Sequence, residues 1–199
     1  MENNISAQES LDYIKNVILD SKNIIKDNGA AAILWGIIIV IAQISTFILI
    51  ATQTYNPITW VWAAAIAIGW TVSLVISKKD SKTGVVTKIL KIESAVWSSA
   101  LVVMPIIGFA GTYSGMISAY AINPLIALIL GSSYYVTGVV YSDRIFKNIS
   151  FGWWIGGTAL FWIKNEYSFL VFAAMMIVLQ IIPGLILYKR YKNTEVKNG

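Results

Sequence analysis

The stretch NGAAAILWGIIIVIAQISTFILIATQTYNPITWVWAAAIAIGWTVSLVIS, residues 28–77, contains no charged side chain. An α-helix crosses the hydrocarbon core of a bilayer in about 20 apolar residues, so this stretch has room for two crossings. Asn56-Pro57 interrupts it beyond its midpoint, and this dipeptide is typical of a turn. We therefore predict that the stretch forms a helical hairpin inside a membrane.

The rest of the chain repeats this alternation of long uncharged stretches and charged joints. No charged residue lies between Glu93 and Asp143, which leaves room for two more crossings, or between Glu166 and Lys189, which leaves room for one. Only 13% of the residues are charged, against about 25% in a soluble domain. We predict an all-α membrane protein with six transmembrane helices, at 30–51, 58–77, 94–113, 119–141, 148–163 and 167–188.

The predicted helix at 148–163 is the shortest of the six and contains the aromatic stretch FGWWIGGTALFW at 151–162. It reaches only about 24 Å at the usual rise per residue. It crosses the membrane if it stands nearly upright and if Lys147 and Lys164 extend toward the headgroups. Most tryptophans, Trp153 among them, are expected at the headgroup level, where the ring is apolar and the N–H reaches water.

Gly152, Gly156 and Ala159 place small side chains along one face of this short helix. Small residues at this spacing let two helix backbones approach closely in lipid. The face is therefore predicted either to pack against another helix of the same chain or to form the seam of a homodimer.

The positive charges indicate how the helices are oriented. Of the 15 Lys and Arg residues, only Lys164 falls on the side of the membrane opposite to the two termini. Basic loops stay in the cytoplasm, so we predict that both termini are cytoplasmic and that the protein lies in a cytoplasmic (inner) membrane. The net charge of +5 is not concentrated in a soluble module, so we expect these cations to meet the lipid bilayer and not nucleic acid.

Residues 1–29 precede the first predicted crossing, and we predict that they contain a cytoplasmic amphipathic helix. Ser6 and Glu9 have the spacing of a capping box at its start. Acidic residues outnumber lysines here, which favours a protein surface over anionic lipid, although binding to the membrane, to the bundle or to a protein partner all stay open. A basic tail at 189–199 closes the chain. The candidate docking face of the amphipathic helix consists of Leu11, Ile14, Ile18 and Ile25.

The chain offers few groups for catalysis. It contains no histidine and no cysteine, and the six predicted spans contain no acidic or basic side chain. Metal sites and general acid–base catalysis depend on such groups. We therefore expect no enzyme activity, no metal and no cofactor.

Neutral polar residues and prolines remain as candidate functional groups. Gln43 and Gln180 lie near the middles of the first and sixth spans, and Pro105 and Pro183 interrupt the third and sixth. One interpretation is hydrogen bonding between helices. The other is a small polar cavity, because interrupted helices at corresponding positions of two halves point to a transport site. The two functional hypotheses are therefore a non-enzymatic membrane protein that acts through protein or lipid contacts, and a small carrier or channel for a neutral solute.

Three short motifs carry a resemblance to a known family. They are ISAQESLDYI at 5–14, the DNG at 27–29 with Trp35-Gly36 in the following span, and IIPGLILYKRYK at 181–192. They resemble a bacterial family of uncharacterised multi-pass membrane proteins that are often encoded beside a winged-helix transcriptional regulator. The resemblance implies a bacterial cytoplasmic membrane and assigns no activity, substrate or site residue.

Overall fold

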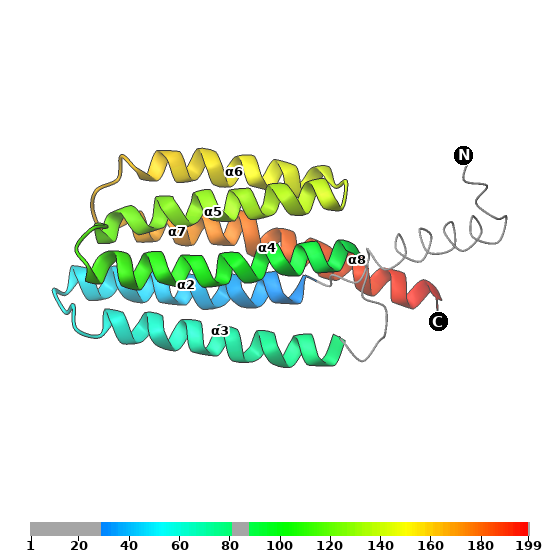
Figure 1. The fold of residues 1–199 in the computed structure, drawn as a ribbon, viewed down its shortest axis with the longest axis horizontal. Coiled ribbons are helices and arrows are strands. Elements are labelled where there is room, and N and C mark those ends of the chain that lie inside the picture. The colour runs from blue at the N-terminus through cyan, green and yellow to red at the C-terminus, as the bar shows by residue number, and fades with distance from the viewer. Residues whose placement is uncertain (1–28, 81–87, 199) are drawn as a thin grey trace, which may run out of the picture.

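The described part of the chain consists of antiparallel helices that share one long axis (Figure 1). The computed structural model describes residues 29–80 and 88–198. No strand occurs among these residues, so the predicted all-α class is confirmed. The elements in chain order are α2 (Ala30–Ala51), α3 (Ile58–Asp80), α4 (Lys88–Pro105), the π-helical segment η3 (Ile106–Gly111), α5 (Ala119–Val140), α6 (Arg144–Leu160), α7 (Tyr167–Met176), the π-helical segment η4 (Ile177–Ile181) and α8 (Ile182–Asn198).

Successive helices turn back at alternating ends of the bundle (Figure 1). Because α4 runs directly into η3, and α7 continues through η4 into α8, the described elements form six continuous helices. The turns 52–57, 112–118 and 161–166 lie at one end, which we name the loop end. Gly29, the turn 141–143 and the C-terminal part of α8 lie at the opposite end, which we name the terminal end.

Five helices are long and apolar enough to cross a membrane, namely Ala30–Ala51, Ile58–Val75, Lys91–Gly111, Ala119–Val140 and Tyr167–Lys189. Helix α6 has only 17 residues and does not join them, so five of the six predicted spans are recovered. It begins at Arg144 and not at residue 148, because the Asp143 side chain accepts a hydrogen bond from the backbone N–H of Ile145 (2.7 Å) and caps the helix there. The first turn of α6 is therefore partly polar, and its apolar portion is correspondingly short.

The other helices differ from the predicted spans chiefly at the terminal end. Helix α2 begins and ends at the predicted residues 30 and 51. Helix α3 continues past residue 77 to Asp80, α4 begins at Lys88 ahead of residue 94, and α8 runs through the predicted basic tail to Asn198. Lysine and arginine have good helix propensity, so charged residues that follow a crossing prolong the helix.

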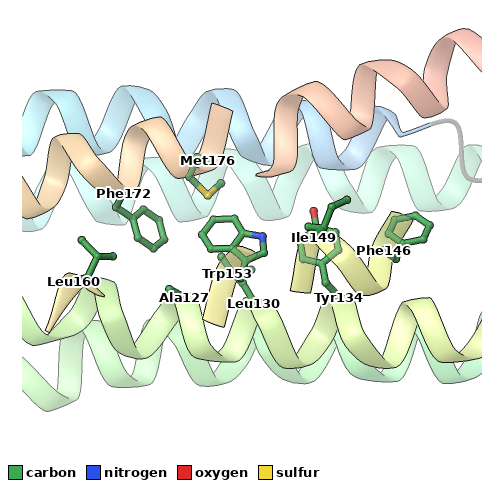
Figure 2. Close-up of a cluster of buried hydrophobic side chains, with 9 residues drawn as sticks. All are labelled: Ala127, Leu130, Tyr134, Phe146, Ile149, Trp153, Leu160, Phe172 and Met176. Carbon is green, nitrogen blue, oxygen red and sulfur yellow. The ribbon is translucent and has the colours of Figure 1, made fainter. Parts of the chain in front are cut away.

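The apolar core lies between α5, α6 and α7 (Figure 2). Trp153 is fully buried in it, and its ring lies 5.6 Å from that of Phe172 between centroids. The prediction that Trp153 lies at the headgroup level is therefore wrong, because α6 begins at Arg144 and brings this residue to the middle of the helix. The core side chains are Ala127, Leu130 and Tyr134 of α5, Phe146, Ile149, Trp153 and Leu160 of α6, and Phe172 and Met176 of α7.

Small residues let α5 and α6 pack closely. A Cβ atom added to Gly131 would lie 2.4 Å from the ring of Trp154, and one added to Gly157 would lie 2.8 Å from the Cβ of Ala127. In lipid the hydrophobic effect does not drive helices together, so van der Waals attraction between closely packed backbones has to hold them. Glycine at these positions makes that approach sterically feasible.

Helices α3 and α4 lie at the periphery and expose large apolar side chains. Soluble monomers rarely expose so much apolar surface, whereas helices that face acyl chains do so as a rule. These two faces therefore fit an environment of lipid. The exposed side chains include Trp60, Ile68, Trp70, Leu74 and Val75 of α3 and Ile92, Val102 and Val103 of α4.

Two glycine backbones touch where the chain enters α2. A Cβ atom added to Gly29 would lie 2.3 Å from the carbonyl oxygen of Gly184 in α8. Gly29 also has φ +65°, in the left-handed region that favours glycine. The contact joins the start of the first described helix to the last one, through Gly29 and Gly184, which belong to two of the motifs on which the family resemblance rests.

We predict that Gly29→Ala lowers the free energy of unfolding by about 2 kcal/mol, because it inserts a methyl group into a backbone contact. Gly108→Ala is the matched control, since no atom lies within 4 Å of a Cβ added there, and its effect should be close to zero. Thermal unfolding of the detergent-purified variants measures both. Equal melting temperatures for the two variants would contradict the Gly29–Gly184 contact.

Candidate functional site

Three polar side chains from different helices meet in the interior, in the half of the bundle nearer the loop end. Gln43 of α2 donates from Nε2 to Oδ1 of Asn123 in α5 (2.9 Å). Asn123 donates from Nδ2 to Oε1 of Gln43 (3.5 Å) and to Oγ of Ser168 in α7 (3.3 Å). We name these three residues the amide cluster.

The directions of the helices explain why these residues meet. Helices α5 and α7 both begin at the loop end, so Asn123 in the second turn of α5 and Ser168 in the first turn of α7 lie at similar depth. Helix α2 runs the opposite way and reaches the same depth with Gln43, about two turns before its end.

A second polar contact extends this arrangement to α3. Thr46, one turn beyond Gln43, donates its hydroxyl to the carbonyl oxygen of Ala42 (2.8 Å) and accepts from Nε1 of Trp62 (3.1 Å). Thr46 is 1% exposed and Trp62 is half-buried, so this contact lies at the edge of the interior. The polar interior therefore links α2 to α3, α5 and α7.

The amide cluster is neutral and closed to solvent. The exposed fractions of Gln43, Asn123 and Ser168 are 0%, 1% and 0%. Amides and a hydroxyl have no proton to transfer near neutral pH, so the cluster supplies hydrogen bonds and not acid–base chemistry. Such bonds between membrane helices contribute about 0.6 kcal/mol each on average. The arrangement therefore fixes how the helices pack.

The structure does not bring Gln180 to this cluster. Gln180 lies in η4 and donates from Nε2 to the backbone carbonyl oxygen of Ala32 (3.3 Å). Ala32 and Gln43 lie about 16 Å apart along α2 at the usual rise per residue. The two glutamines therefore occupy different depths and do not line one polar cavity.

The two predicted prolines adjoin π-helical segments. Pro105 ends α4 directly before η3, and Pro183 follows η4 after one residue. Proline lacks an N–H, and its ring crowds the carbonyl four residues earlier, which for Pro183 is that of Leu179 inside η4. The N–H of Ile182 bonds to the carbonyl oxygen of Ile177, five residues back, as a π-helical turn requires. Both helices predicted to be interrupted thus carry a widened turn.

Two surface grooves lie away from the amide cluster and from Gln180. One of about 380 Å³ runs between α4 and α5 and includes Ser99 and Ser132. Ser99 donates its hydroxyl to the carbonyl oxygen of Val96 (2.8 Å) and Ser132 donates to that of Leu128 (3.0 Å), both within their own helices. These hydroxyls therefore make the groove less polar than two free serines would. The other, of about 590 Å³, lies between α3 and the end of η3. Neither groove includes a glutamine or proline of the predicted cavity.

Two of the three residues of the predicted small-residue face of α6, Gly152 and Gly156, pack within the chain. A Cβ atom added to Gly152 would lie 2.8 Å from Leu179, and one added to Gly156 would lie 2.4 Å from Met175. Ala159 is exposed. Of the two interpretations left open by the sequence, the structure favours packing between α6 and the helix formed by α7 and η4.

The candidate docking face, formed by Leu11, Ile14, Ile18 and Ile25, lies outside the described residues.

At the terminal end the acid nearest to a predicted span, Glu93 of α4, accepts a hydrogen bond from the hydroxyl of Tyr141. Within the described residues no three His, Cys, Asp or Glu side chains gather in a way that could hold a metal ion.

Sequence reasoning missed two of the three residues of the amide cluster. Asn123 is the most polar residue of the predicted span 119–141, and an asparagine inside an apolar run is a signal that it has a partner in the interior. Ser168 carries no such signal, because serines are frequent in this sequence and several, such as Ser99 and Ser132, bond to their own helices. Comparisons with protein-family models, curated proteins and solved structures give no match to this chain. The resemblance to an uncharacterised bacterial family therefore stays a prediction.

We predict an interaction free energy of about 1 kcal/mol between Gln43 and Asn123 in a double-mutant cycle with Gln43→Met and Asn123→Leu. These replacements keep the approximate shape of each side chain and remove its hydrogen-bonding atoms. Each single variant leaves the partner unsatisfied, so the double variant should be more stable than the sum of the two effects implies. Stability is measured by reversible unfolding in mixed micelles. Ser99→Ala is the control, with an effect near zero because its hydroxyl bonds only to its own helix. Strict additivity of Gln43→Met and Asn123→Leu would contradict the pairing.

Proposed function

We propose that this chain is a multi-pass protein of a bacterial cytoplasmic membrane that has no catalytic activity and acts through contacts with protein or lipid. The observation that carries the proposal is the closed polar interior. Gln43, Asn123 and Ser168 lie in a region with almost no exposed surface, and their side chains are hydrogen-bonded to one another and not to a substrate or solute. The polar residues described there thus serve packing.

The distribution of charge supports a cytoplasmic terminal end. Exposed cations at this end include Lys91, Arg144, Lys189 and Lys192, whereas Lys164 lies in the turn 161–166 at the loop end. Exposed aromatic side chains gather at the loop end, as expected for a membrane–water interface. They include Trp60 at 76%, Tyr113 at 97% and Trp162 at 75% exposure.

Helix α6 completes the proposed topology as a sixth crossing. It runs antiparallel to α5, from the turn 141–143 at the terminal end to the turn 161–166 at the loop end (Figure 1). Five crossings would leave the two termini on opposite sides of the membrane, but Gly29 and the end of α8 lie at the same end of the bundle. Six crossings fit this arrangement, with α6 held upright by its long interface with α5 and its ends reaching the headgroups.

The proposed contacts involve two kinds of surface. The apolar faces of α3 and α4 fit lipid, because large side chains are exposed along them. The amphipathic segment 5–27 is the proposed docking element for a protein, because its acidic character disfavours anionic headgroups.

A carrier for a neutral solute is the second candidate, and one observation favours it. The third and sixth helices each contain a π-helical segment, η3 and η4, and such segments occur frequently at functional sites. Transporters built from two three-helix halves place interrupted helices at corresponding positions. Under this hypothesis, Gln180 is the polar side chain at the interrupted position of the sixth helix.

We predict opposite accessibility of single cysteines placed at the two ends of the bundle. The chain has no native cysteine, so each introduced thiol reports alone. In intact cells a membrane-impermeant maleimide should label Tyr113→Cys and Asn165→Cys from outside and leave Ser142→Cys unlabelled until the membrane is opened. Labelling of Ser142→Cys and Asn165→Cys from the same side would contradict a crossing by α6.

We predict that a photo-crosslinking amino acid at Ile14 forms a protein adduct in living cells, because this position lies on the proposed docking face. Asp20 lies on the opposite face of the same helical wheel and is the matched control. Adducts are detected as shifted bands and identified by mass spectrometry. Equal yields at the two positions would contradict a docking face, and uptake of a neutral solute by vesicles of the purified protein would favour the carrier.

A further inference from the structure

Two buried polar atoms have no hydrogen-bond partner among the described residues. They are Nε1 of Trp153 in α6 and Oε1 of Gln180 in η4. The side chains are 0% and 4% exposed, so water outside the bundle does not reach them. Buried polar groups are almost always paired, and each exception calls for a physical explanation.

The packing of α6 against α7 and η4 directs these two residues to the same side of the interface. Gly152 faces Leu179 and Gly156 faces Met175 across this antiparallel interface. In an antiparallel pair, the residues that follow two facing residues both point to the same side of the interface, because the helical rotation is reversed along with the direction. Trp153 and Gln180 follow Gly152 and Leu179, so both point to one side.

The neighbouring turn supports this geometry. Gly157 and Met176 follow the facing pair Gly156 and Met175, and both are buried on the core side of α6 and α7. Figure 2 shows the indole nitrogen of Trp153 on the edge of the ring that points away from Phe172 and toward Ile149. That edge faces the terminal end, the direction in which Gln180 lies one turn beyond Met176.

The two atoms are chemically complementary but do not bond to each other. The indole Nε1–H only donates, and the amide Oε1 only accepts. The Gln180 amide is held by its other atom, because Nε2 donates to the carbonyl oxygen of Ala32. Pro183 also provides no N–H to the turn that contains Gln180, which leaves that turn one donor short.

We propose that Trp153 Nε1 and Gln180 Oε1 together form a binding site for one neutral O–H group, which accepts from the indole and donates to the amide oxygen. Water has this chemistry, and so does the hydroxyl of a small solute. Buried waters typically make about three hydrogen bonds to otherwise unsatisfied groups. A cation would be repelled by the indole N–H, and an apolar guest would leave both atoms unpaired.

The test uses the full-length protein in detergent micelles, labelled with 15N in its eight tryptophans. Trp153→Phe identifies the Trp153 indole resonance, and this resonance should show a cross-peak to water in the unsubstituted protein. Gln180→Met keeps the length of the side chain and removes its hydrogen-bonding atoms, so it should abolish that cross-peak. Added glycerol should shift the resonance if a solute hydroxyl takes the site, and leave it in place if water holds it.

Trp154 provides the matched control, because its Nε1 already donates to the carbonyl oxygen of Leu128 (3.3 Å) and its resonance should not respond to Gln180→Met. If Trp153→Phe does not fold, the test uses Gln180→Met alone. In that variant, one indole resonance other than that of Trp154 should lose its cross-peak to water. The proposal is overturned if Gln180→Met changes no indole resonance. It is also overturned if the Trp153 indole shows neither a water cross-peak nor a glycerol response, which would mean that no hydroxyl group binds there.

Discussion

Hydrocarbon offers no partner for a hydrogen bond, so each polar group inside a membrane bundle has to be satisfied by the protein itself. The described helices meet this constraint in two ways. Hydroxyl groups bond to carbonyls of their own helix, as Thr71 does with Ala67 (2.7 Å) and Thr137 with Ser133 (2.9 Å). Amide groups are too polar to be satisfied in this manner, and they bond between helices, as Gln43 does with Asn123. Hydrogen bonds between helices therefore help to fix which helices are neighbours and at what depth, and they include the hydroxyls of Ser168 and Thr46, which accept from Asn123 and Trp62.

The same solvent changes what holds the helices together. Acyl chains are as apolar as leucine, so burying leucine stabilises the bundle little and close backbone packing stabilises it more. This explains why glycines stand at the tightest approaches, with Gly69 against the ring of Trp35 and Gly36 against Ile181. It also explains the division of the bundle into a packed part and a periphery. Helix α5 carries glycine, alanine and serine toward its neighbours and is half buried, whereas α3 and α4 present large side chains outward.

The sequence was sufficient for the fold class and for most helices, because uncharged stretches of the right length have few alternatives in a folded chain. The predicted span 30–51 matches α2, and the turn at Asn56-Pro57 separates α2 from α3. The start of helix α6 was less predictable, because it is set by the cap at Asp143 and not by the point where the uncharged stretch begins. The candidate site was predicted only in part. Gln43 and Gln180 were recognised as interior polar residues, but pairing across helices depends on register and direction, so the partnership of Gln43 with Asn123 and not with Gln180 could not follow from hydropathy.

In the sixth helix, a close backbone contact lies next to a departure from regular α-helical geometry. Gly184 has to lie against the backbone of Gly29, and Pro183 immediately before it displaces the helix from regular α geometry into the wide turn of η4. The Gln180 side chain, which belongs to that turn, donates from Nε2 to the carbonyl oxygen of Ala32 in α2. The other atom of the same amide, Oε1, has no hydrogen-bond partner among the described residues. Departures of this kind are expected at functional sites, where interactions specific to the site outweigh regular structure. In this bundle the polar interior near the loop end is closed on itself, whereas the buried side-chain atoms without a partner among the described residues lie at Gln180 in η4 and at Trp153 in α6.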